Sequence, residues 1–212
     1  DLARLEAPHA ADRVETLPWS VPTPVPARPA GDAPTLVTAF GWVDASRQPM
    51  KLVAALAAIL REHPDARLAF VGPIDARLRR ELRPQARELG VEDALAIVGA
   101  VDRRKYASWL ERTTVAVQLR GVSNGESSST VAECLARGIA TITTGIGATL
   151  ELPAGCVRLV ATDVTAEELA SEICELAGDT EQRSELAEAG RTFARANHAD
   201  SFAELVWERV LA

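Results

Sequence analysis

Short apolar runs alternate with helical stretches from Pro34 onward, and this alternation restricts the fold more than any other feature. The runs are nearly continuous in hydrophobicity and rich in β-branched residues, as is typical of strands buried on both faces. They are TLVTAF (35–40), RLAFVG (67–72), ALAIVG (94–99), TVAVQL (114–119), ATITT (140–144) and VRLV (157–160). Strands that alternate with helices form a parallel sheet covered on both faces. The sequence therefore predicts an α/β fold, with a Rossmann-like parallel sheet of six strands and a helical C-terminal third.

Helices are expected between and after these runs. The predicted segments are 50–62, 75–89, 103–111, 127–137, 165–177, 180–196 and 199–211. Asp75 is a candidate N-cap, and Thr165 with Glu168 fits the capping-box pattern. Pro84 is expected to kink or break the second helix, because proline removes a backbone donor.

The N-terminal segment differs in composition from the rest of the chain. Seven of the twelve prolines fall within the first 34 positions. Proline favours extended backbone, so residues 1–33 are predicted to be a linker or a strap over a surface, and residues 34–212 to be the folded domain. The sequence begins at Asp1 and its only methionine is Met50, so we expect a part of a longer polypeptide or a trimmed one.

Charge and composition exclude several classes of function. The net charge of −7 argues against a nucleic-acid partner, because a phosphate backbone requires a positive face. There is no apolar run of membrane-spanning length and no secretory leader, so we expect a cytoplasmic protein. The three cysteines, Cys134, Cys156 and Cys174, have no metal-binding spacing and are expected to be reduced thiols. No DxD-type or other metal motif is present, and the abundant Ala and Arg indicate a high-GC bacterial source.

Glycine recurs where the predicted strands end. These positions are Gly41, Gly72, Gly99, Gly121 and Gly145. Glycine allows a ligand to approach the backbone closely, and parallel sheets bind ligands at the carboxyl ends of their strands. The alternative is that strand-to-helix turns need glycine for their own geometry. The glycine-lined edge is still where we expect a ligand.

The stretch SNGESSSTVAECLARG places small polar residues directly before a helix. If the helix begins near Ser127, its first amides lack partners and its dipole attracts anions. Gly125 would admit a ligand, and Ser127, Ser128 and Ser129 would add hydroxyl groups. The simpler interpretation is that the serines only cap the helix. The favoured prediction is a phosphate or diphosphate site.

Two carboxylates, Glu126 and Glu133, stand seven residues apart in this stretch. Two helical turns would put them on nearly the same face, about 10 Å apart. Carboxylates accept hydrogen bonds from sugar hydroxyls, so the pair could bind the ribose and the sugar of a nucleotide-diphosphate sugar. The alternative for Glu133 is a solvated helix face.

Two arginines could balance the charge of a diphosphate. Arg47 follows the first strand in the turn GWVDASR, and Arg120 ends the fourth strand. If they converge on one pocket, they would form charge-assisted hydrogen bonds to phosphate oxygens. Each could instead be an ordinary surface cation.

The segments FGWVDASRQPMKLVAAL, IVGAVDRRKYASWLERTTVAVQL and SNGESSSTVAECLARGIATITT together resemble the C-terminal, donor-binding domain of a GT-B glycosyltransferase. The resemblance covers residues 34–212 and is greatest to glycosyltransferase family 4. It implies transfer of a sugar from a nucleotide-diphosphate sugar, of the hexosyltransferase type, with retention and without a metal or other cofactor. It also implies an N-terminal acceptor domain that this chain lacks. The chain alone would then be inactive, and peripheral membrane contact would occur through the missing domain.

The resemblance also implies roles for individual residues. The base would lie near Gly99 and Val101, and Glu133 would hold the ribose. Residues 126–129 would hold the diphosphate and the sugar, with Glu126, Arg47 and Arg120 as the catalytic groups. The first turn, with Gly41 and Trp42, would line the donor site.

The sequence departs from the family pattern at a few of these positions. Glu126 stands seven rather than eight residues before Glu133, so that Gly125 occupies the usual place. Trp42 replaces an arginine of the family, and Arg47 falls where the family has lysine.

Two other classes of function compete with this reading. A Rossmann-like oxidoreductase would need GxGxxG after the first strand, which the turn GWVDASR does not provide. A non-catalytic Rossmann-like module could instead bind nucleotide, or a protein partner through Phe202 and Trp207 of the last helix.

Overall fold

The computed structural model describes residues 19–26 and 34–211, which contain a sheet of six parallel strands in the order β3-β2-β1-β4-β5-β6. The strands are β1 (Leu36–Phe40), β2 (Arg67–Val71), β3 (Leu95–Gly99), β4 (Val115–Gln118), β5 (Ala140–Thr144) and β6 (Arg158–Val160). Each lies within or coincides with one predicted run. The predicted Rossmann-like fold is thereby confirmed.

The order of the strands reverses between β1 and β4. These neighbours pair Val37 with Val115 and Thr38 with Ala116. The chain leaves β1 towards β2 and leaves β4 towards β5, so the two connections diverge. A crevice for a ligand forms at such a switch point, outside the carboxyl ends of the strands.

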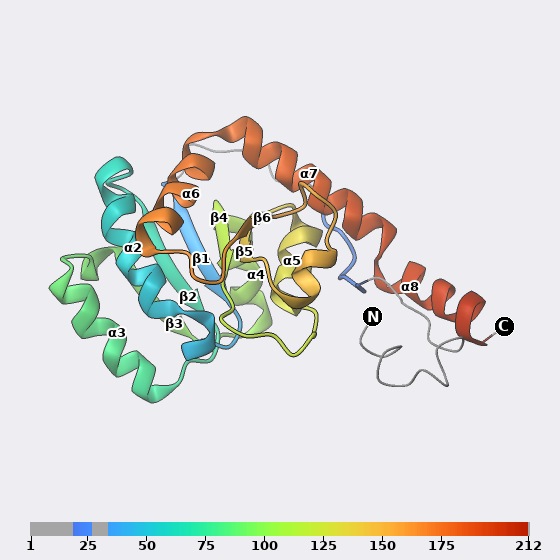
Figure 1. Cartoon of the computed structure of the whole chain (residues 1–212), viewed down its shortest axis with the longest axis horizontal. Helices are drawn as coiled ribbons and strands as arrows, with labels where there is room; N and C mark the ends of the chain where they lie inside the picture. The colour runs from blue at the N-terminus through green and yellow to red at the C-terminus, as the bar shows by residue number, and fades with distance from the viewer. Residues whose placement is uncertain (1–18, 27–33, 212) are drawn as a thin grey trace.

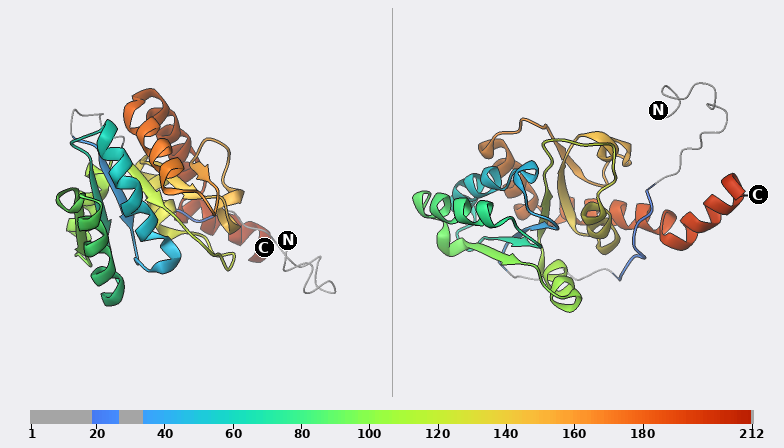
Figure 2. Two further views of the ribbon diagram at one scale, coloured as in Figure 1. Left: turned by 60° about the vertical axis from the view of Figure 1, so that its left-hand side comes forward. Right: turned by 90° about the horizontal axis from the view of Figure 1, so that it is seen from below.

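Helices cover both faces of the sheet (Figures 1 and 2). On one face lie α2 (Pro49–Glu62), α3 (Ala76–Glu88) and α6 (Ala166–Gly178), and on the other α4 (Arg103–Arg112) and α5 (Ser129–Arg137). Helix α7 (Thr180–Ala196) packs along α5, and α8 (Ala199–Val206) continues past the sheet. Three short 3₁₀ helices lie in loops of the described chain: η2 (Ala45–Arg47), η3 (Glu92–Ala94) and η4 (Gly147–Glu151). A short π-helix, η5 (Trp207–Leu211), follows α8.

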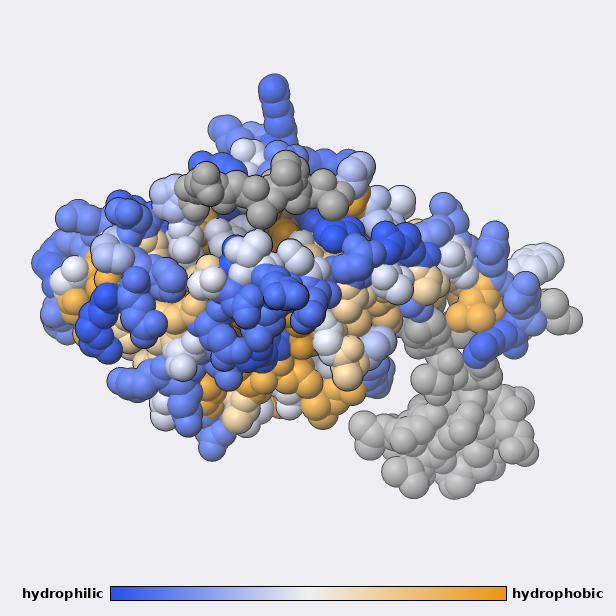
Figure 3. Space-filling model, turned by 90° about the horizontal axis from the view of Figure 1, so that it is seen from above, coloured by the Kyte–Doolittle hydropathy of each residue, from blue (hydrophilic) through white to orange (hydrophobic). Residues whose placement is uncertain are grey.

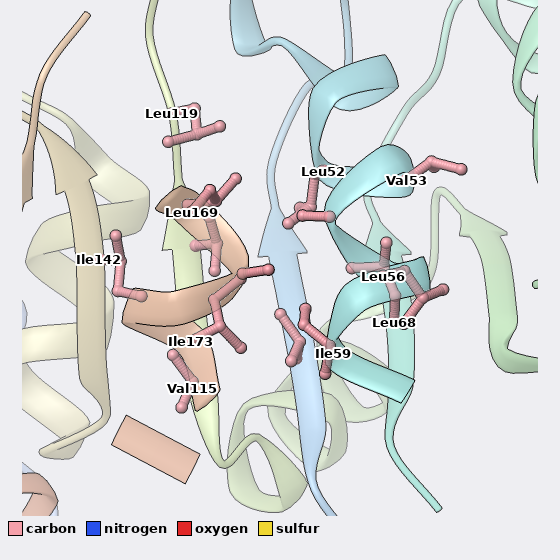
Figure 4. Packing of buried hydrophobic residues seen from close by; sticks show 14 of the residues in the cluster. Leu52, Val53, Leu56, Ile59, Leu68, Val115, Leu119, Ile142, Leu169 and Ile173 are labelled. Carbon is pink, nitrogen blue, oxygen red and sulfur yellow. The ribbon is translucent and has the colours of Figure 1, made fainter. Parts of the chain in front are cut away.

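The core forms where the apolar stripes of α2 and α6 meet the sheet. Leu52, Leu56 and Ile59 of α2 are buried beside Leu169 and Ile173 of α6 (Figure 4). Burial of each such side chain contributes about 1.5–3 kcal/mol. This face therefore holds the strands, and the loops at their ends, in place.

The opposite face has a smaller core that reaches the switch point. Phe40 at the end of β1 packs edge-on against Tyr106 of α4, with ring centroids 5.4 Å apart. Cys134 of α5 lies in the same cluster. Like Cys156 and Cys174, it is buried and forms no disulfide.

A strap of residues 19–26 runs beside α5 and α7. Trp19 and Val21 are buried in a cluster with residues of both helices. The Val21 amide donates to the carbonyl of Asn197 (3.0 Å), and the Val25 amide to that of Ala136 (3.1 Å). The remainder of the predicted linker, 1–18 and 27–33, lies outside the described residues, and the domain boundary stays a prediction.

The caps at Asp75 and at Thr165 with Glu168 are confirmed, but the helix is not broken at Pro84. Helix α3 continues through Pro84 because the residues on either side, Leu82 and Ala86, are anchored in the core.

The last predicted helix, 199–211, is also corrected, since its regular part ends at Val206 and the turns from Trp207 are π-helical. Helix α8 buries no residue, and Figure 3 shows an apolar group on it at the surface. Within the described part of the chain, no helix has the length and apolar composition to cross a membrane.

A substitution at Gly72 can test how tightly the ends of the strands are packed. Its φ of +147° suits only glycine, and a Cβ there would collide with the carbonyl oxygen of Gly41. We expect Gly72→Ala to lower the free energy of unfolding by about 3 kcal/mol or more. The control Gly178→Ala, with open space at the end of α6, should raise it by about 0.5 kcal/mol. Urea denaturation measures both, and equal effects would contradict the packing described here.

Candidate functional site

The loops after β1 and β4 meet at the carboxyl edge of the sheet (Figure 2, right). The Gly121 amide donates to the carbonyl of Ser46 (2.7 Å), which joins the loops directly. The Arg120 amide donates to the Thr144 hydroxyl (2.9 Å), which ties the second loop to the end of β5. Both loops are therefore held by backbone hydrogen bonds around the switch point.

The amino end of α5 lies against the end of β1. Ser128 is the N-cap and accepts from the Val131 amide (3.4 Å), so the helix begins at Ser129, two residues later than Ser127. A Cβ on Gly41 would be 2.8 Å from the Thr130 side chain, which shows how close the first turn comes. The free amides and the dipole of this turn give its tip a partial positive charge, which favours an anion there.

Gln118 holds the switch point together, and the sequence reasoning did not identify it. With its amide oriented to satisfy every neighbour, it accepts from the Phe40 amide (3.0 Å) and donates to the Phe40 carbonyl (3.1 Å) and the Thr130 hydroxyl (3.3 Å). It thus connects β4, β1 and α5. A polar residue in the otherwise apolar run TVAVQL was the available signal.

Arg47 is the most unusual side chain at the edge. It is half-buried, and its Nη1 atom is buried without a hydrogen-bond partner. Burial, and next the charge of Arg120, lower the pKa of its guanidinium, while Asp44 and Glu126 partly oppose them. Since an unpaired buried donor costs free energy, this group is set up to receive an anion.

Arg120 already has an anion in place. Its guanidinium pairs with the carboxylate of Glu126, and its side chain is only 11% exposed, against 48% for Glu126. The other Glu126 oxygen accepts from the Asn124 amide (2.8 Å). Hydrogen bonds from backbone amides, and then Arg120, lower the pKa of Glu126. Glu126 is therefore a counter-ion within the chain.

The predicted geometry of Glu126 and Glu133 is wrong. The spacing of two helical turns does not apply, because Glu126 lies in the loop before the N-cap Ser128. Glu133 is half-buried on α5 and faces Tyr106 of α4. Burial, and next the charge of Glu133, raise the pKa of the Tyr106 phenol.

The other predicted site residues lie along the same edge. Gly125 has a φ of +87° and open space around it, and Trp42 is 59% exposed. Ser127 lies in the loop, and Gly99 ends β3, with half-buried Val101 just beyond it. The structure thus brings together Arg47, Arg120, Glu126 and the tip of α5, while Gly99 and Val101 lie two strands away from β1. No group of three potential metal ligands is found in residues 19–26 and 34–211.

Comparison with known proteins identifies the family. The family "Glycosyl transferases group 1" matches residues 34–193. No curated protein sequence matches the chain significantly. The solved structures similar to it include the C-terminal domain of the glycosyl transferase group 1 family protein LpcC from Francisella tularensis. That likeness has 19% identity and a TM-score of 0.68, and covers 76% of this chain and 85% of that one.

Two larger solved structures share the fold. Alr3699/HepE from Anabaena, in complex with UDP, has 18% identity and a TM-score of 0.72, with 83% of this chain and 48% of that chain covered. Sucrose-phosphate synthase from Thermosynechococcus elongatus has 23% identity and a TM-score of 0.68, with 82% and 44% covered. This chain spans about half the length of these proteins.

The counter-ion role of Glu126 predicts that a substitution at this residue strengthens the binding of an anion. We expect Glu126→Gln to lower the dissociation constant for inorganic pyrophosphate severalfold, since the ligand no longer competes with a carboxylate for Arg120. Isothermal titration calorimetry measures it. Glu111→Gln, an exposed change of equal charge at the far end of α4, controls for net charge and should have no effect. Weaker binding in Glu126→Gln would contradict the competition and would mean that Glu126 positions Arg120 for the anion.

Proposed function

We propose, since this chain belongs to the glycosyl transferase group 1 family, that it is the donor-binding half of a glycosyltransferase that uses a nucleotide-diphosphate sugar. The observation that carries this proposal is the buried, unpartnered Nη1 of Arg47, beside Arg120 and the tip of α5. Among solved structures of this fold, Alr3699/HepE is in complex with UDP or UDP-glucose. We further assign the chain to glycosyltransferase family 4, on the sequence segments that resemble it.

The chemistry follows from the charges at the edge. Negative charge builds up on the diphosphate as the bond to the sugar breaks. Two guanidinium groups and a helix tip, fixed in advance, stabilise that charge without having to reorganise. Their positive charge can do the work that a metal ion does in other transferases, so the proposed reaction is metal-independent and, as in the family it resembles, retaining.

Glu126 and Glu133 receive distinct roles in this proposal. The diphosphate takes over Arg120 and releases Glu126, whose carboxylate then lies close to the hydroxyls of the sugar. Glu133 holds the ribose from the side of α5 that faces α4. Gly41, Trp42 and Gly125, with Ser127, Ser128 and Ser129, line the donor cleft.

The second half of the enzyme supplies the acceptor. Because the chain spans about half of several similar structures, we propose an N-terminal acceptor domain as its partner and expect the chain alone to bind donor without transferring sugar. Its three unpaired cysteines suit a cytoplasmic location. Any peripheral contact with a membrane would be made by the partner domain.

Binding of nucleoside diphosphates tests the proposal. We expect the chain to bind UDP, GDP or another nucleoside diphosphate, and Arg47→Met to weaken that binding about 10-fold to 100-fold, because charged hydrogen bonds to phosphate are lost. The control Arg61→Met removes an exposed arginine in the last turn of α2 and should leave affinity unchanged. Binding of NAD to the chain is measured by calorimetry in the same way. If only NAD binds, or if Arg47→Met binds as well as the wild type, the proposal fails.

A further inference from the structure

We infer that Arg79 selects the base of the donor, favouring the keto bases uracil and guanine over adenine. This inference rests on the proposed function, because it assumes a diphosphate at the tip of α5. It concerns a residue of α3 that neither the sequence motifs nor the phosphate site involves.

The structure limits the direction in which a nucleotide can extend from the phosphate site. On the β5 side, the turn at Gly147 packs directly against Ser123, so η4 and the loop after β4 already fill the edge. On the other side, Gly72 directly follows β2, and β3 ends at Gly99. The nucleoside therefore extends over the ends of β2 and β3.

Arg79 stands at the end of that path. Gly99 has a φ of +80°, and a Cβ there would be 2.8 Å from Nη2 of Arg79. The guanidinium thus covers the last residue of β3. Strands are spaced by about 4.8 Å, so this point lies roughly 10 Å from the end of β1. In a nucleoside diphosphate, the ribose separates the diphosphate from the base by a distance similar to the one between the end of β1 and Gly99.

The arginines of α3 differ in their partners. Arg77 pairs with Glu81 (2.9 Å) and Arg87 with Glu92 (3.0 Å), both at the surface. Among the described residues, the Arg79 side chain forms neither an ion pair nor a hydrogen bond, although the residue is half-buried. The side chain of Arg83, one turn later, also has no partner among the described residues, but Arg83 is exposed. Arg79 is therefore the arginine of this helix that is both free and held against the proposed nucleotide path.

The chemistry of the guanidinium decides which base it prefers. It carries only donors, in a planar fork. Guanine offers the acceptors O6 and N7, and uracil, like thymine, offers O4. Adenine places an amino donor at the corresponding position, which opposes the donors of arginine. The site should therefore discriminate in favour of keto bases.

The test compares UDP, GDP and ADP by calorimetry in the wild type, Arg79→Met and Arg83→Met. We expect the wild type to bind UDP or GDP at least about tenfold more tightly than ADP. Arg79→Met should reduce this ratio to nearly one, mainly by weakening the keto nucleotide. Arg83→Met should leave the ratio unchanged. Arg79→Lys, which keeps the charge but loses the fork, should give an intermediate ratio, and unchanged melting temperatures confirm that the variants fold.

Failure of this inference can be told apart from failure of the proposed function. Preference of the wild type for ADP, or an unchanged ratio in Arg79→Met, overturns the role of Arg79 and leaves the diphosphate site intact. If the wild type binds neither these three nucleotides nor any other nucleoside diphosphate, the proposed function fails and this inference fails with it.

Discussion

The reversal of strand order between β1 and β4 is the constraint on which the rest of the site depends. It sends the connections after β1 and β4 in opposite directions along the sheet, and it places the amino end of α5 beside the end of β1. Gln118 stabilises this point by hydrogen bonds to Phe40 and Thr130. A buried polar group in a strand is costly unless every hydrogen bond is made, and here its bonds orient the helix tip. The place of the proposed anion site thus follows from the topology of the sheet.

The charges at this edge are balanced only in part. Arg120 has Glu126 as its counter-ion, whereas Arg47 keeps a buried nitrogen without a partner. The same low-dielectric surroundings that make this arrangement costly in the free chain strengthen its interaction with an incoming anion. If the proposed ligand binds here, the site gives up some stability of the free chain for affinity.

Much of this could be predicted from the sequence, because it depends on local patterns. The strands follow from β-branched apolar runs. Arg47 and Arg120 were predicted from their places after strands, and Glu126 from its place before the helix, and the structure brings all three to one edge of the sheet. The relation of Glu126 to Glu133 could not be predicted, since the choice of Ser128 among three serines as the N-cap moved the helix start. Pro84 was misjudged because core contacts outweighed its local preference. Arg79 did not stand out among the five arginines of α3, because only the fold shows which of them meets Gly99.

The most direct measurement is a crystal structure of the chain with a bound nucleoside diphosphate such as UDP. The account predicts the terminal phosphate at the tip of α5, within hydrogen-bond distance of Nη1 of Arg47, with Arg120 turned from Glu126 to the phosphate. Phosphates bound elsewhere, or an Arg120–Glu126 pair that persists beside an unpartnered Arg47, would contradict it.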